Sequence, residues 1–288
     1  MENTRITSKD IRSDNNFDLN TTAKHFSSND FWYYTSAATA SLILSNKCFH
    51  VSCFNEMNDL NEIRLHEEEK DKIHALCFVN SKSEKIPMWY LYGGITGKGV
   101  SLGFTPSVML KFIRSIETVT SVGDKSRVLY RGRDFDLQYG WVYYCKKEKD
   151  TAGYAEVFFK NTWYTVMDRD DFEKDNYFIK DYGWNYEKEF RLIFINKTNI
   201  PINKIRVDFN NDILRALKIR IAPEMDENIK NAFLTSEGML SWSNSKIMES
   251  ELGIKMDIIK RNKDSIIDYV KERASEYPTN ELYYILSR

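Results

Sequence analysis

The segment Glu189–Ile195 constrains the fold more than any other part of the chain. It reads Glu-Phe-Arg-Leu-Ile-Phe-Ile, which alternates at first and is then continuously apolar. This pattern is typical of a central strand that is buried on both faces of a sheet. Further strands are expected at Phe31–Ser36, Ile73–Val79 and Val100–Phe104. The chain is therefore predicted to fold around a strand-rich sheet.

Short helices are expected between these strands. Ala37–Ser45 follows Thr35 and Ser36, either of which suits an N-cap, and Pro106–Ser115 follows Thr105 in the same way. Aromatic residues make up 14% of the chain, with only 5 Pro and 12 Gly, and aromatic side chains favour half-buried pleated surfaces. We predict an α+β fold with a strand-rich, two-sheet core, short helices and a helical C-terminal appendage.

Composition changes twice along the chain and predicts three parts. Residues 1–30 are rich in Asn, Asp, Ser and Thr and are expected to form a flexible N-terminal arm. Residues 31–222 are expected to form the main domain, and residues 223–288 a helical extension. The evidence for this extension is a set of apolar residues that share one helical face: Ile259, Ile266, Ile267, Val270 and Ala274.

Charge and cysteine content exclude several classes of protein. The chain has 41 Lys and Arg against 42 Asp and Glu, a net charge of −1, so contact with nucleic acid would need a local patch. No apolar run reaches the roughly 18 residues of a spanning helix, and the polar N-terminus lacks a signal peptide. The 4 irregularly spaced cysteines are expected to be reduced. We expect a soluble cytoplasmic protein without membrane contact.

Three further motifs bear on metal, nucleotide and nucleic-acid binding. Cys48-x-His50-x-x-Cys53 and His74-x-x-Cys77 lack the paired spacing of structural zinc sites, so no metal is predicted. The glycines between Gly93 and Gly99 lack the P-loop spacing and precede a strand. Around Val128–Tyr130, basic residues are interleaved with aromatic ones, which fits either a solvated face or a contact for single-stranded nucleic acid. The basic residues are Lys125, Arg127, Arg131, Arg133, Lys146 and Lys147.

The sharpest feature is a pair of carboxylates at the start of the apolar strand. Glu187 and Glu189 are two residues apart, so on a strand both would project to one face. Repulsion between them would raise the pKa of one, leaving a base beside a carboxylate that positions a substrate. Alternatively the pair lies at a strand edge, paired with Lys188 or Arg191 in a structural role.

Five sequence boxes resemble, in this order, a broad bacterial family catalogued as a domain of unknown function. The resemblance covers roughly residues 31–222, and its layout is similar to mono-ADP-ribosyltransferase toxins of toxin–antitoxin and phage-defence systems, in particular those that modify nucleic acid. The boxes are Phe31–Ser36 (FWYYTS), Asn58-Asp59, Ala75–Val79 (ALCFV), Pro87–Phe104 (PMWYLYGGITGKGVSLGF) and Trp184–Leu192 (WNYEKEFRL).

The resemblance implies a site for NAD as co-substrate. NAD would lie between the first strand and the Trp89/Tyr92 box, so the implied binding residues are Tyr33, Tyr34, Thr35, Ser36, Trp89 and Tyr92. It also implies that Glu189 is the catalytic acid that stabilises the ribosyl cation, with Glu187 as its partner. The chain departs from the pattern in two places. Tyr33 stands where the family often has His, and Val79 stands where it usually has Ser.

The function implied is that of an NAD-dependent ADP-ribosyltransferase, acting as a toxin or antiphage effector. The target would be nucleic acid (RNA or DNA) or protein, and an antitoxin or chaperone would be its protein partner. Two alternatives stay open. One is a metal-dependent nuclease-like effector built on Asp181, Glu187, Glu189 and Lys180. The other is a non-catalytic sensor whose aromatic pocket binds a nucleotide or a phage protein.

Overall fold

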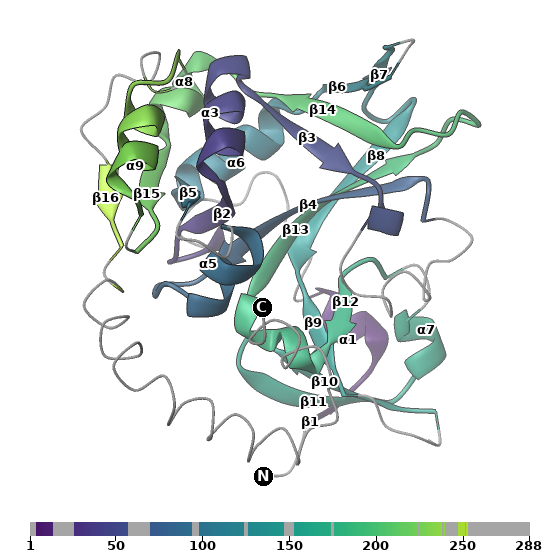
Figure 1. Cartoon of the computed structure of the whole chain (residues 1–288). Coiled ribbons are helices and arrows are strands. Elements are labelled where there is room, and N and C mark those ends of the chain that lie inside the picture. Colours follow the sequence, from purple (N-terminus) through teal and green to yellow (C-terminus); the bar gives the residue numbers. More distant parts are fainter. Residues whose placement is uncertain are drawn as a thin grey trace.

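A computed structural model gives the fold of the chain (Figure 1). The residues it describes are 4–13, 26–56, 70–93, 98–123, 126–146, 153–173, 176–223, 225–237, 239, 247–250 and 252. The predicted strand-rich α+β class is confirmed. Across these residues the strands form three sheets, of seven, five and four strands, where two sheets were expected.

The seven-stranded sheet is built around the strand predicted to be central. β13 (Glu189–Asn196) lies between β4 and β8 and is antiparallel to both, and its residues are buried except for the half-buried Ile195. The prediction of a central strand over Glu189–Ile195 is confirmed. The order of the sheet is β16 (Ile247–Glu249), β15 (Lys218–Ile221), β5 (Gly99–Phe104), β2 (Phe31–Ser36), β4 (Ile73–Asn80), β13 and β8 (Phe135–Trp141).

The four-stranded sheet shares one apolar core with the seven-stranded sheet, and helices cover the other surfaces of that core. Its order is β3 (Cys48–Ser52), β14 (Lys204–Asp208), β6 (Thr118–Ser121) and β7 (Val128–Tyr130). The helices are α3 (Ala37–Asn46), α5 (Ile86–Tyr92), α6 (Pro106–Ser115), α8 (Asn211–Ala216) and α9 (Glu227–Leu234), with a 3-10 turn η1 (Phe54–Glu56). The side chains of Ser36 and Thr105 cap α3 and α6, as the sequence predicts.

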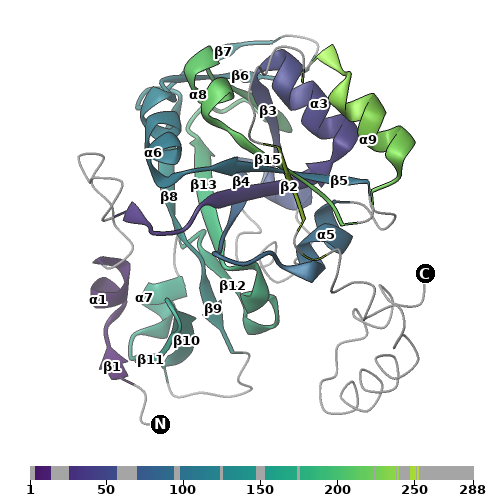
Figure 2. The same cartoon turned by 90° about the vertical axis from the view of Figure 1, so that its left-hand side faces the viewer.

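The five-stranded sheet packs beside this larger part and has a small core of its own (Figure 2). Its order is β1 (Thr4–Ile6), β11 (Thr162–Val166), β10 (Ala155–Phe159), β9 (Tyr143–Cys145) and β12 (Ile179–Asp181). Two short helices, α1 (Ser8–Ser13) and α7 (Arg169–Glu173), lie against it. Only Val142 separates β8 of the large sheet from β9 of this sheet, so one chain segment links the two sheets.

The expectation of a flexible arm is wrong for residues 4–13. β1 pairs with β11 in parallel, the Ser8 hydroxyl donates to Asp168 Oδ2 at 2.6 Å, and Ile11 is only 1% exposed. The polar composition of the segment does not predict this docking, because the contacts are made by a few apolar side chains, Ile6 and Ile11, in an otherwise polar sequence. Phe26 is buried as well and stacks on Phe31.

The C-terminal part is described over two elements. α9 is the helix expected after Pro223, and β16 extends the large sheet by pairing in parallel with β15. Residues 247–249 are therefore a strand, where a helical extension was expected. The apolar helical face at Ile259–Ala274 and the Asn58-Asp59 turn lie outside the described residues.

Candidate active site

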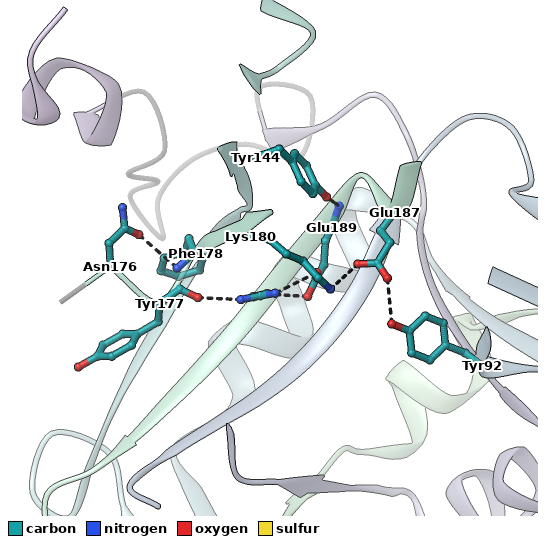
Figure 3. Close-up of polar contacts among 9 residues, drawn as sticks. Tyr92, Tyr144, Asn176, Tyr177, Phe178, Lys180, Glu187 and Glu189 are labelled. Carbon is teal, nitrogen blue, oxygen red and sulfur yellow. Dashed lines mark hydrogen bonds and ion pairs between the residues drawn. The ribbon is translucent and has the colours of Figure 1, made fainter. Parts of the chain in front are cut away.

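The carboxylate pair lies where the five-stranded and seven-stranded sheets meet. Lys180 is in β12, Glu187 ends the 3-10 turn η2 (Tyr182–Glu187), and Glu189 is the first residue of β13 (Figure 3). Asp181 starts η2 by accepting a hydrogen bond from the Gly183 N–H at 2.9 Å. Lys188 then turns the chain into β13 with a left-handed φ of 46°.

The two carboxylates do not share a strand, so the argument from strand alternation is wrong for this pair. Glu187 precedes the left-handed turn, which changes the direction of its side chain relative to Glu189. An ammonium group brings the carboxylates together instead. Lys180 Nζ donates to Glu187 Oε2 at 2.6 Å and to Glu189 Oε2 at 3.2 Å. All three side chains are at most 4% exposed.

Glu189 is held by an arginine as well as by this lysine. Arg191 donates through Nε to Oε1 at 2.6 Å and through Nη2 to Oε2 at 3.1 Å. Its side chain is fully buried, and its Nη1 donates to the Tyr177 carbonyl at 2.9 Å. Burial by itself would raise the pKa of Glu189, but the charges of Arg191 and Lys180 hold that pKa well below its ordinary value. Glu189 is therefore ionised, and both its oxygens are paired; Arg191 is one of the two partners named in the structural alternative, whereas Lys180 is not.

Glu187 is in the opposite electrostatic situation. It is 2% exposed, and its partners are Lys180 and the Tyr92 hydroxyl, which donates to Oε1 at 2.9 Å. Burial raises the pKa of Glu187 to about 7, and the Glu189 charge adds to this effect while Lys180 opposes it. A carboxyl group that changes its ionisation near neutral pH is suited to general acid–base work.

A cavity of about 260 Å³ opens in front of these carboxylates. Aromatic, aliphatic and polar side chains share its wall, and the aromatic ones are Trp32, Tyr33, Tyr34, Phe78 and Tyr92. The lining contains five of the residues expected at the site: Tyr33, Tyr34, Tyr92, Glu187 and Glu189. Lys180 also lines it. Burial raises the pKa of Tyr33 and of Tyr34 to about 12, so both rings present neutral hydroxyl groups.

Three expected binding residues are not among the residues that line this cavity. Thr35 is buried, and Ser36 accepts the Thr39 N–H as the cap of α3. Trp89 is 5% exposed, donates its indole N–H to Glu84 at 3.1 Å, and meets the Tyr34 ring edge-on at 4.7 Å between centroids. Trp89 therefore packs against Tyr34, which itself lines the cavity.

The lining also includes residues that sequence reasoning missed, among them Trp32, His50, Cys77 and Met88. Cys77 lies opposite Arg191 in the β4–β13 register, a position that is evident only when the strand pairing is known. Burial raises the pKa of the Cys77 thiol well above its ordinary value, so this group is not a ready nucleophile. Trp32 lies next to Tyr33, and its aromatic neighbours in the sequence were the available signal.

The chain was compared with known families, curated proteins and solved structures. Residues 88–192 match a family described as a protein of unknown function, DUF2971. A DUF2971 domain is thus present. The chain matches no curated protein and no solved structure. The DUF2971 range includes Tyr92, Lys180, Glu187 and Glu189, whereas Tyr33 and Tyr34 precede it.

The matched range includes the Trp184–Leu192 box and all but the first residue of the Pro87–Phe104 box, whereas the other three boxes precede it. The likeness to ADP-ribosyltransferase toxins stays a prediction. Within the described ranges, no helix is long and apolar enough to cross a membrane. The same ranges contain no group of three His, Cys, Asp or Glu side chains arranged to hold a metal ion.

Proposed function

We propose that this chain is an enzyme that cleaves the nicotinamide–ribose bond of NAD and transfers the ADP-ribosyl group. The observation that carries this proposal is the position of Glu187. It is a buried carboxyl group with a pKa of about 7, bonded by Tyr92 and Lys180, beside a cavity lined in part by aromatic rings. Flat rings bind against aromatic walls, and an acid that titrates near neutrality supports bond cleavage at physiological pH.

The size of the cavity supports a ligand of one ring and one sugar. Sites for drug-sized ligands measure roughly 300–1,000 Å³, and this cavity holds about 260 Å³. The nicotinamide riboside end of NAD, which is one ring and one sugar, is smaller than such a ligand. In this proposal the rings of Tyr33, Tyr34 and Tyr92 surround that end, and the rest of NAD extends out of the cavity.

The proposed reaction is a displacement at the ribose carbon that bears nicotinamide. The carbon–nitrogen bond breaks, and its electron pair neutralises the positive charge of the pyridinium ring. An acceptor oxygen or nitrogen attacks the same carbon, and its proton passes to the ionised Glu187. The negative charge of Glu187 also stabilises the oxocarbenium character of the transition state, as carboxylates do in glycosidases.

Lys180 and Glu189 would act as positioning residues. Lys180 lowers the pKa of Glu187 and thus keeps a fraction of it ionised, while Glu189 and Arg191 hold Lys180 in place. This moves the catalytic role from Glu189 to Glu187. The reason is that both oxygens of Glu189 are already bonded to cationic side chains.

The geometry favours this reaction over the metal-dependent nuclease. The ammonium group of Lys180 lies between the two carboxylates, at the position that a bridging divalent ion would need. The Asp181 carboxylate is engaged with the backbone of η2. The action as a toxin or antiphage effector, and the antitoxin or chaperone, stay proposals that depend on the family resemblance alone.

The proposal is tested by nicotinamide release from NAD with the purified full-length chain. Glu187→Gln keeps the shape of the side chain but removes its charge, and loss of one such contact typically costs on the order of 10²–10³ in rate. The matched control is Glu173→Gln, which removes a half-buried carboxylate paired with Arg169 on α7. Equal rates for Glu187→Gln and the wild type would overturn the proposal. So would hydrolysis of nucleic acid that needs Mg²⁺ and not NAD, or NAD binding without any turnover.

A further inference from the structure

A second cavity, of about 330 Å³, borders Glu189 as well. Among the described residues it shares no other lining residue with the first cavity. Its lining is mainly polar and basic, in contrast to the partly aromatic wall in front of Glu187. Two loops supply its cations, since Lys160 lies in the turn between β10 and β11 and Lys188 in the turn before β13.

The two lysines make this cavity electropositive, because Lys180 and Arg191 already offset the charge of Glu189, the acidic residue in its lining. Lys188 donates to Asn161 Oδ1 at 3.2 Å, and its ammonium group lies 4.7 Å from the centroid of the Phe158 ring. Within the described residues it has no carboxylate partner. Lys160 lies in a turn with φ of 47°, followed by Asn161 with φ of 65°, and its ammonium group is 5.3 Å from the centroid of the Trp141 ring. Both cations thus lie beside aromatic rings at one cavity.

A buried hydroxyl group adds a hydrogen-bond donor. Tyr144 lines the cavity, is 3% exposed, and accepts the Glu189 N–H at 2.8 Å. That contact uses an oxygen lone pair, so the hydroxyl proton is not used in it and can be donated to a ligand. Two ammonium groups and a hydroxyl donor at one cavity match an anion with several acceptor oxygens, and a phosphate group is such an anion.

A cluster of three aromatic rings borders the cavity, and Phe158 belongs to both the cluster and the cavity lining. Phe158, Trp163 and Tyr182 contact one another with centroid distances of 4.8–5.6 Å, and all three are half-buried. Lys146 lies 4.4 Å from the centroid of the Trp163 ring, and its charge is balanced by Glu156. Rings that are partly exposed beside cations are the surface on which unpaired bases stack.

We propose that the second cavity and this ring cluster together bind single-stranded nucleic acid. A backbone phosphate lies between Lys160 and Lys188, and neighbouring bases stack on the accessible faces of Phe158, Trp163 and Tyr182. Trp163 and Tyr182 do not line the cavity, so the aromatic surface extends beyond it, which favours a strand over a single nucleotide. A role for this strand as the acceptor of ADP-ribose rests on the proposed function. The binding of the strand does not depend on that function.

The basic residues around Val128–Tyr130 fit this role less well. Arg133 pairs with Asp134 at 2.8 Å, and Arg127 lies 3.8 Å from the same carboxylate. The one carboxylate of Asp134 thus offsets part of the charge of both arginines. Lys125 and Lys147 lie outside the described residues.

The test is fluorescence anisotropy with a labelled 12-nucleotide single strand of mixed sequence, as RNA and as DNA. The full-length chain is used without NAD, so binding and nicotinamide release succeed or fail separately. The double variant Lys160→Gln/Lys188→Gln should bind at least about tenfold more weakly than the wild type. Each neutralised phosphate contributes about −0.7 to the slope of log affinity against log salt. The two lysines hold one phosphate, so the double variant should also lose about 0.7 of that slope.

A matched control and a second variant keep the test decisive. Lys111→Gln removes an exposed lysine of α6, away from the cavity, and should bind as the wild type does. If the double variant does not fold, Trp163→Ala carries the test, with an expected loss of about fivefold or more from one lost stack. Equal binding by the folded variants, or no binding by the wild type at 100 µM protein, would overturn the proposal. Competition by AMP as strong as that by the unlabelled strand would also overturn it, because the site would then hold one nucleotide only.

Discussion

Replacement of Glu187 by glutamine should change how the stability of the protein depends on pH. The pKa of Glu187 is about 7 in the folded protein and near 4.5 in the unfolded chain. Between about pH 4.5 and pH 7, Glu187 is mostly protonated in the folded protein and mostly ionised in the unfolded chain. The stability contributed by Glu187 is therefore complete below about pH 4.5 and is lost as the pH rises to 7.

The size of this effect follows from the difference between the two pKa values. Each tenfold change in proton affinity corresponds to about 1.4 kcal/mol, so the wild type loses about 3 kcal/mol from this one group. Glutamine does not titrate, and the other acidic groups are present in both proteins. The free energy of unfolding of Glu187→Gln should thus rise relative to that of the wild type by about 3 kcal/mol between pH 5 and pH 8.

Urea unfolding of both proteins at pH 5, 6, 7 and 8 measures this difference directly. Glu173→Gln, which changes a half-buried carboxylate outside the cavity, gives the baseline. A difference between Glu187→Gln and the wild type that stays constant over this range would refute the reasoning. It would mean that Glu187 is ionised throughout, and its proposed role in proton transfer would lose its physical basis.

Three further predictions concern neighbouring features. Glu189→Gln leaves the fully buried Arg191 without its carboxylate and should cost about 3–5 kcal/mol of stability, measured by urea unfolding; unchanged stability would contradict the ion-pair assignment. Tyr92→Phe removes the hydroxyl donor to Glu187, which should raise the pKa of Glu187 further and move the pH profile of nicotinamide release to higher pH; an unmoved profile would show that this bond has no influence. Ile11→Ala should destabilise the protein by about 2–5 kcal/mol in thermal or urea unfolding, whereas an unaffected protein would return residues 4–13 to a dispensable arm.

The sequence predicts the parts of the fold that depend on local patterns. The central strand at Glu189–Ile195 follows from its apolar run, and the caps at Ser36 and Thr105 follow from side chains placed just before a helix. The docking of residues 4–13 could not be predicted in this way. It depends on β11, about 160 residues further along the chain, which offers an edge for pairing.

The candidate site was predicted less completely, for a related reason. Order in the sequence grouped Trp89 with Tyr92, but it does not say which of these side chains faces the cavity. The left-handed turn at Lys188 separates Glu187 from the strand. The sequence does not predict this turn, because lysine is not a residue that favours a positive φ. The roles of Glu187 and Glu189 then depend on which carboxylate Arg191 reaches. That choice is made by packing and not by spacing.

The ionic cluster has a consequence for finding related proteins. Its four charged members, Lys180, Glu187, Glu189 and Arg191, all lie within residues 180–191, although they join two different sheets. The spacing Lys-x6-Glu-x-Glu-x-Arg can therefore serve as a search pattern in chains too divergent for alignment. The pattern also sets a limit on length variation. Lys180 and Glu189 are fixed by their strands, so an insertion or deletion in η2 would displace Glu187 relative to both, and chains that keep the whole cluster should keep this spacing.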